Sequence, residues 1–279
     1  MAVTTEPRAG RPPGLQAATV AEAFQSTARA HPDRVALRTK GDELSMTWRE
    51  YAEKVEATAG GLAGLGLRRG DTLAIMLTNR PEFHWFDAAA LHLGATPFSL
   101  YNTYTAEQIQ YQVKDAGARI LVTENAFAER AQGLEGLSHL LVVDDEDAAP
   151  VEDNAPEGFD FEAAWRAVAP DDLLTLIYTS GTTGPPKGVQ LTHANLVAGI
   201  NGFDRVIAFP DEGRLVSWLP MAHVAERNCT HYLPMFVGYS TTCCPDPRQV
   251  WPTCPRCARA GSSRCPASGR SSRPPSRRA

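Results

Sequence analysis

Apolar residues recur at helical spacing where the regular sequence begins, and Val20, Phe24 and Ala28 would share one face of a helix. The apolar run 35–39 follows and predicts a strand. The two patterns then alternate along the chain, as parallel strands joined by helical crossovers do in sequence. We therefore expect an α/β fold with mostly parallel sheets and helices on both faces. The expected strands are 35–39, 72–77, 96–100, 119–123, 140–143 and 172–178.

Two capping boxes mark the beginnings of helices. Thr47 with Glu50, and Thr105 with Gln108, have the spacing at which two side chains and two backbone N–H groups bond reciprocally. The first helix should run toward Gly64. The run 64–70 resembles a dinucleotide-binding fingerprint, but its glycines are one residue too widely spaced and close a helix instead of opening one. We interpret them as the end of the helix.

Three further segments have clear patterns. Residues 81–93 predict a helix whose aromatic side chains, Phe83, Trp85 and Phe86, pack in the core. Residues 144–160 contain eight acids, two prolines and little apolar material, so we expect a solvated surface loop. Residues 161–168 predict a helix.

Charge and cysteine content narrow the class of protein. The chain has 27 Lys and Arg against 32 Asp and Glu, a formal net charge of −5, so we expect no nucleic-acid partner. No apolar run approaches a signal-peptide core or a membrane span, although peripheral membrane contact remains open. All six cysteines follow residue 228, so the sequence before them is typical of the cytosol. We expect a soluble cytoplasmic protein.

The segment 178–189 carries the clearest chemistry. It follows a buried strand and reads Tyr-Thr-Ser-Gly-Thr-Thr-Gly-Pro-Pro-Lys-Gly-Val. Glycines let backbone N–H groups approach an anion, hydroxyls add donors, and a lysine adds a positive charge, so this composition suits phosphate. It is not a Walker loop, because Lys187 precedes a glycine where that motif has glycine directly before lysine. A plain flexible turn would not need so many donors.

This segment, continued to His193, resembles the phosphate-binding signature of the adenylate-forming (AMP-binding) superfamily. Four other segments are similar to the long-chain fatty acyl-CoA synthetase branch, and the resemblance covers about 19–250. These segments are 62–71, 79–82, 94–104 and 217–227. The resemblance implies a two-step ligase: a fatty acid carboxylate attacks the α-phosphate of ATP, and the thiol of CoA then displaces AMP from the acyl-adenylate.

The resemblance also implies site residues and ligands. The loop would bind the β- and γ-phosphates of ATP, and His223 would lie near the acyl and adenylate pocket. ATP, Mg²⁺ and CoA are the expected substrates and cofactors, with no metal ligand assigned in this chain. The implied phosphate-binding residues are Thr179, Ser180, Gly181, Thr182, Thr183, Gly184 and Lys187.

Several polar residues nearby have plainer interpretations. A lone histidine beside apolar residues, such as His223, is more often a satisfied structural group than a functional one. Glu226 and Arg227 match the family but are interpreted as an exposed pair on a helix surface. His193 should open the next helix, with Thr192 or Asn195 as its cap.

The last segment, 251–279, is a different kind of sequence, with seven arginines and no acid. A zinc knuckle around Cys254 and Cys257 lacks four coherently spaced ligands, and a disordered basic arm is an alternative. A third interpretation is a frameshift. Some of the codons that can encode these residues would, in a shifted reading frame, encode a sequence that resembles the continuation of the family. We therefore predict that the tail is frameshifted. We thus expect a disordered stretch at 1–18, a partial AMP-binding domain at 19–250 and a basic, unstructured tail at 251–279.

Three classes of function follow. The first is an ATP-dependent ligase that activates long-chain fatty acids to acyl-CoA, inactive in this truncated form because segments for the base, the ribose, Mg²⁺ and the α-phosphate are missing. The second is a nucleotide- or phosphate-binding remnant without turnover. A nucleic-acid or zinc protein built on the basic tail is a distant third. The sequence does not indicate the length of the acyl chain.

Overall fold

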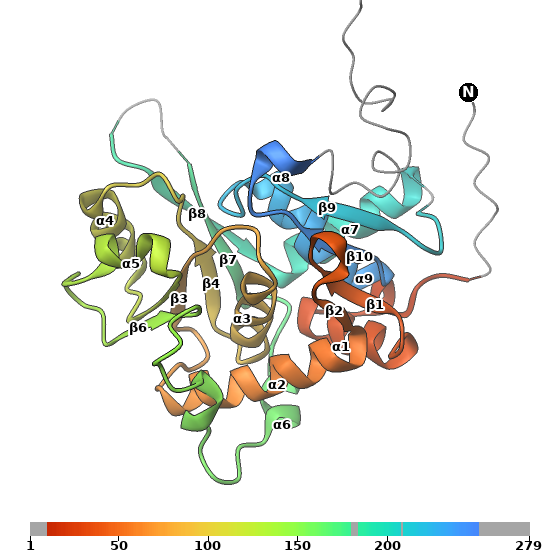
Figure 1. The fold of residues 1–279 in the computed structure, drawn as a ribbon. Coiled ribbons are helices and arrows are strands. Elements are labelled where there is room, and N and C mark those ends of the chain that lie inside the picture. Colours follow the sequence, from red (N-terminus) through yellow and green to blue (C-terminus); the bar gives the residue numbers. More distant parts are fainter. Residues whose placement is uncertain (1–9, 180–183, 208, 251–279) are drawn as a thin grey trace, which may run out of the picture.

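In the described part of the chain, the strands form two sheets that lie side by side (Figure 1). This computed structural model describes residues 10–179, 184–207 and 209–250. Among these residues the larger sheet has six strands in the order β6-β5-β3-β4-β7-β8, all parallel to their neighbours except β8, which runs antiparallel to β7. Its strands are β3 (Thr72–Met76), β4 (Thr96–Ser99), β5 (Ile120–Thr123), β6 (His139–Val142), β7 (Leu173–Thr179) and β8 (Lys187–Thr192).

The smaller sheet has four described strands in the order β2-β1-β10-β9. Strands β1, β10 and β9 are parallel, whereas β2 pairs antiparallel with β1. Its strands are β1 (Val35–Arg38), β2 (Ser45–Thr47), β9 (Arg214–Ser217) and β10 (Ser240–Cys243). The chain therefore leaves this sheet after β2, builds the larger sheet, and returns for β9 and β10.

Helices connect most of these strands, and three of them begin with a capping box. Thr47 and Thr105 cap α2 and α4 as predicted, and Thr192 caps α7, which begins at His193. The helices are α1 (Val20–Ala30), α2 (Trp48–Gly64), α3 (Pro81–His92), α4 (Ala106–Ala116), α5 (Asn125–Ala131), α6 (Phe161–Arg166), α7 (His193–Val206), α8 (Val224–Glu226) and α9 (Leu233–Val237). Shorter helical turns are η1 (Pro13–Gln16), η2 (Lys40–Asp42), η3 (Val151–Asn154) and η5 (Pro247–Gln249), and η4 (Arg227–Tyr232) is a π-helix.

Strand β3 shows how the larger sheet is covered on both faces. Because successive side chains of a strand point to opposite faces, Leu73 and Ile75 join one apolar cluster while Ala74 and Met76 join another. The first cluster contains residues of α2 and α3, and the second contains residues of α4. This arrangement confirms the predicted α/β fold with mostly parallel strands and flanking helices.

Two expectations at the edges of the fold need correction. Residues 13–16, inside the stretch expected to be disordered, form η1, and Leu15 is buried in the main apolar cluster. The acidic segment 144–160 is mostly exposed, as predicted, but η3 packs closely on α2. A Cβ at Gly61 or Gly64 would collide with the backbone of η3, so these two helical glycines permit the contact.

Large apolar side chains reach the surface after the middle of α7. Phe203 is 59% exposed and Val206 is 84% exposed. We expect poor solubility from such a surface. Of the helices described, not one combines the length and the apolar character that crossing a bilayer requires.

Candidate phosphate-binding site

The predicted phosphate loop joins β7 to β8, and its two ends face each other across this antiparallel pair. Thr179 pairs with Lys187, and Tyr178 pairs with Gly188. Thr179 and Lys187 are both exposed at the mouth of the loop. Gly184 has a φ of +91°, a left-handed conformation that favours glycine. Ser180, Gly181, Thr182 and Thr183 lie outside the described residues.

Helix α4 fixes both ends of the loop through two side chains one helical turn apart. The Tyr111 hydroxyl donates to the carbonyl oxygen of Pro186 at 3.0 Å, just before β8. The Tyr178 hydroxyl donates to Oδ2 of Asp115 at 2.8 Å, just before the loop begins. Burial and the neighbouring Asp115 carboxylate raise the pKa of Tyr178, so its proton stays in this hydrogen bond. The mouth of the loop is thus anchored to one face of α4.

Lys187 has the properties of an anion ligand. Its side chain is exposed, and within the described ranges it forms no ion pair that would hold its ammonium group away from a ligand. On the next residue, a Cβ at Gly188 would lie 3.3 Å from the Tyr178 ring, so glycine lets the strand pass close to that anchor. An exposed ammonium group opposite a hydroxyl, at the mouth of a glycine-containing loop, suits phosphate oxygens.

His223 lies in a different part of the fold. It follows β9 of the smaller sheet and caps α8, where its Nδ1 accepts a hydrogen bond from the Ala225 N–H at 3.2 Å. The imidazole is exposed. This contact accounts for the residue structurally, and its place near an acyl and adenylate pocket remains a prediction.

The interpretation of Glu226 and Arg227 as an exposed surface pair is wrong. Glu226 is 4% exposed and Arg227 is completely buried. Glu226 accepts hydrogen bonds from the Trp218 N–H at 3.0 Å and the Thr230 hydroxyl at 2.9 Å, and burial raises the pKa of its carboxyl group. The two residues have separate hydrogen-bond partners, so they do not neutralise each other.

Arg227 is the centre of a buried polar network that sequence reasoning missed. Its guanidinium forms an ion pair with Asp87 of α3, which is also completely buried. It donates to the Ser99 hydroxyl at 2.5 Å and to the Tyr232 hydroxyl at 2.9 Å. Because Asp87 and Ser99 belong to the larger sheet's layer and Arg227 follows the smaller sheet's β9, the network joins the two sheets.

Two buried histidines extend this network. His231 Nε2 lies 2.8 Å from Oδ1 of Asp87, and its Nδ1 lies 3.0 Å from Nδ1 of His84. Burial lowers the pKa of both histidines, and for His231 the Asp87 carboxylate opposes that effect. Arg227 and His231 belong to the π-helix η4, which places both side chains toward Asp87. Asp87, which stands between the apolar residues 85–86 and 88–91 of α3, is the signal that could have predicted a buried partner.

The described part of the chain offers no group of three or more His, Cys, Asp or Glu side chains that could hold a metal ion. Cys254 and Cys257, considered above as half of a zinc knuckle, lie outside the described residues, as does the basic tail.

The family model for AMP-binding enzymes matches residues 24–258, so the chain belongs to this family. Solved structures show the same fold. The N-terminal domain of FACL13 from Mycobacterium tuberculosis aligns with a TM-score of 0.69 and 24% identity over 84% of this chain and 59% of that one. A long-chain-fatty-acid-CoA ligase (FadD1) from Archaeoglobus fulgidus aligns with a TM-score of 0.73 and 23% identity over 87% of this chain and 49% of that one.

Sequence relatives include CoA ligases. Long-chain-fatty-acid–CoA ligase FadD15 of Mycobacterium bovis is 33% identical over 71% of this chain and 36% of its own length. 4-Coumarate-CoA ligase 1 of Narcissus pseudonarcissus is 35% identical over 70% of this chain and 37% of its own length. The chain thus spans about a third of these relatives (36% and 37%). The protein is a member of an adenylate-forming ligase family that uses ATP and CoA and includes fatty acyl-CoA ligases among its relatives.

Proposed function

We propose that the loop 179–187 binds the β- and γ-phosphates of ATP, and that the chain carries this part of a ligase that activates long-chain fatty acids. The observation that carries the proposal is the anchored mouth of the loop, where Thr179 faces the exposed Lys187 across β7 and β8. The Tyr111 and Tyr178 hydrogen bonds support it, because they hold the two ends at a fixed separation.

In the whole reaction this loop has an electrostatic role. Lys187 and the loop's N–H and hydroxyl donors would hold the pyrophosphate part of ATP in line with the attacking carboxylate and stabilise its charge as it leaves. Mg²⁺ would arrive with ATP, and CoA would accept the acyl group in the second step. Thr179 and Lys187 fit a phosphate ligand, and we assign no Mg²⁺ or CoA ligand to the described residues.

We also propose that residues 1–279, expressed alone, bind ATP without turning it over. By the resemblance, the segments that fix the base and ribose, hold Mg²⁺ and meet the α-phosphate are not among these residues. Correct positioning of the reactants alone can lower an activation barrier by about 7–11 kcal/mol. Without most of this positioning, and without stabilisation of the developing charge, adenylation should be undetectably slow. The same 279 residues should release no pyrophosphate with ATP, Mg²⁺ and palmitate.

A thermal-shift experiment tests the binding proposal. Saturating ATP and saturating tripolyphosphate should each raise the Tm of the chain, whereas adenosine should not, because only the phosphates meet the loop. Lys187→Ala should remove most of the shift. Lys40→Ala is the matched control, because Lys40 is an exposed lysine of the smaller sheet's β1–β2 connection and its ammonium group donates to the Gln249 side chain, far from the loop in sequence. Equal shifts for the two variants would refute the proposal.

A further inference from the structure

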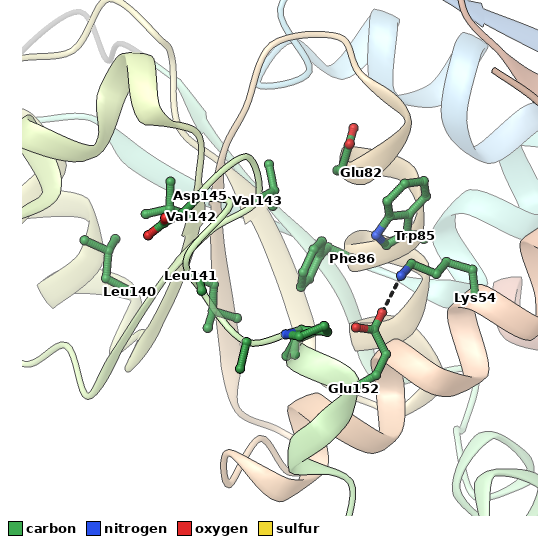
Figure 2. A pocket seen from close by; sticks show the side chains of 14 residues that line it. Lys54, Glu82, Trp85, Phe86, Leu140, Leu141, Val142, Val143, Asp145 and Glu152 are labelled. Carbon is green, nitrogen blue, oxygen red and sulfur yellow. Dashed lines mark ion pairs between the residues drawn. The ribbon is translucent and has the colours of Figure 1, made fainter. Parts of the chain in front are cut away.

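A pocket of about 330 Å³ lies at the edge of the larger sheet opposite the phosphate loop, because β6 and β8 are the two outer strands of that sheet. Figure 2 shows Trp85 and Phe86 of α3 on one side of this pocket, and Leu141 and Val143 on the other. Lys54 of α2 and the segment 148–152 complete the wall. None of these residues has a part in the function proposed above.

The pocket reaches the free edge of β6. It is lined by four consecutive residues, Leu140 to Val143, and consecutive side chains point to opposite faces of a sheet. Leu141 and Val143 pack with the apolar cluster of Trp85 and Phe86, so the cavity lies on that face of the sheet and reaches its outermost strand, where it also touches Leu140 and Val142. Within the described residues, β6 pairs only with β5, so its other edge carries no strand.

The hydrogen-bond register shows which backbone groups face this edge. The N–H groups of His139 and Val143 donate to carbonyl oxygens of the β5 side, at 3.1 Å and 2.9 Å. In a parallel ladder these bonds come from every second residue, so the backbone groups of Leu140 and Val142 point away from β5. The Val142 carbonyl accepts from the Asp145 N–H at 3.4 Å. In the part of the chain that the structure describes, the N–H groups of Leu140 and Val142 and the carbonyl of Leu140 have no strand partner and can pair with another strand.

The far wall of the pocket is built in advance. Glu152 lies 2.6 Å from the Lys54 ammonium and accepts from the Thr58 hydroxyl at 3.2 Å (Figure 2). The close contact of η3 with Gly61 and Gly64 fixes the same segment to α2. Lys54 also lies 5.4 Å from the centre of the Trp85 ring. A ligand would find both walls in place and would not have to order them.

The negative charge at this edge indicates what kind of ligand would bind there. Residues 144–147 are four acids that directly follow β6, and residues 131–165 contain no Lys or Arg. Nearby cations are engaged, because Lys54 pairs with Glu152 and Arg80 pairs with Glu82, Glu124 and Asp144. A second copy of the chain would bring a β6 segment without a cation to the same acidic edge. A partner with Lys or Arg beside an apolar side chain fits better.

We propose that the free edge of β6 binds an extended basic peptide of a partner protein. The peptide adds a strand beside Leu140 and Val142, places an apolar side chain between Trp85 and Val143, and sets its Lys and Arg residues against the acidic run 144–147. In this mode of recognition the backbone bonds give affinity, while the pocket and the charges give specificity.

The test uses a fluorescein-labelled probe peptide, Lys-Lys-Val-Phe-Val-Arg-Arg with blocked ends, and the full 279-residue chain. Fluorescence anisotropy should show saturable binding at low salt. The peptide Glu-Glu-Val-Phe-Val-Asp-Asp should bind at least tenfold more weakly. Hydrogen exchange should slow at the amides of Leu140 and Val142 when the basic peptide is bound, a result that charge attraction without strand pairing would not give.

Two double variants distinguish an effect of the β6 edge from an effect of the protein's overall negative charge. Asp145→Lys with Asp147→Lys should weaken the basic peptide at least tenfold, whereas Asp153→Lys with Glu157→Lys, the same charge change outside the pocket, should alter binding less than threefold. Equal effects of the two pairs, absent binding, or unchanged exchange at Leu140 and Val142 would overturn the proposal. Dimerisation of the chain that protects the same two amides would show that a second copy is the occupant and would overturn it as well.

Discussion

Arg227 and Asp87 are 140 residues apart in the chain, and together they form an ion pair in which both side chains are completely buried. The pair joins α3 to the π-helix η4 and thereby one sheet layer to the other. Breaking a buried pair leaves one charge without compensation, which costs about 3–5 kcal/mol. Asp87→Ala should therefore lower the free energy of unfolding by about this amount in urea denaturation.

The control for this variant is Glu162→Ala, which removes the partner of Arg166 in an exposed ion pair. Surface substitutions of this kind stay within about 0.5 kcal/mol. If Asp87→Ala cost no more than Glu162→Ala, the two sheets would not depend on the buried pair.

Buried neutral histidines should make the fold sensitive to acid. Burial lowers the pKa of His92 to about 4, and that of His193 also to about 4. An unfolded histidine has a pKa of about 6.5, so above that pH both states are neutral and stability is flat. As the pH falls below 6.5, the unfolded state binds protons that the folded state excludes, and stability declines until the folded pKa is reached.

Each of these histidines should account for about 3 kcal/mol of that loss, on the order of 1.4 kcal/mol per pKa unit. The Tm of the chain should accordingly fall between pH 6.5 and pH 5, before most carboxylates titrate. His92→Gln should flatten this part of the profile. A Tm that is constant from pH 7 to pH 5 would contradict this explanation.

Two Gly→Ala variants in helices should have opposite effects on stability. In α2, a Cβ at Gly64 would lie 1.7 Å from the Asn154 carbonyl oxygen, so Gly64→Ala must displace η3 and should destabilise the protein by about 1–3 kcal/mol. In α7, a Cβ at Gly199 would meet no described atom within 4 Å, so Gly199→Ala should stabilise it by about 1 kcal/mol. Thermal melts of both variants check this, and a Gly64→Ala variant that is as stable as the unaltered chain would show that η3 does not pack on α2 as described.

The anchors of the phosphate loop should matter more for binding than for folding. Tyr111→Phe removes the hydrogen bond to the Pro186 carbonyl and keeps the ring. Holding the loop in its binding conformation without this bond costs about 1 kcal/mol more, so the affinity for tripolyphosphate should fall about fivefold, with a Tm change of only a few degrees. Tyr101→Phe, which removes a hydroxyl from the loop after β4, serves as the control. Calorimetric titration measures both, and an unchanged affinity for Tyr111→Phe would contradict the anchoring role.

Local signals in the sequence were sufficient for much of the fold. The capping boxes at Thr47 and Thr105 use partners three residues away, and the strand before the phosphate loop is a continuous apolar run. These elements could be predicted because their stabilising contacts lie within a few residues. The two ends of the loop could also be located, since the loop directly follows that strand.

Long-range partners could not be predicted in the same way. Nothing near Arg227 in the chain shows that Asp87 will neutralise it, so a surface position was the reasonable but wrong expectation. The Tyr111 and Asp115 anchors are ordinary polar residues of an amphipathic helix until β7 and β8 are placed beside them. The contact of η3 with α2 likewise depends on two glycines whose purpose is visible only when the two backbones meet.

The most direct test of the account is the phosphorus NMR spectrum of ATP titrated with the 279-residue chain. Binding through the loop predicts that the β- and γ-phosphorus resonances shift or broaden with the chain and with Lys40→Ala, and that Lys187→Ala abolishes most of the effect. Resonances that stay unchanged with the unaltered chain, or that respond equally to Lys187→Ala, would contradict the claim that residues 179–187 bind the phosphates of ATP.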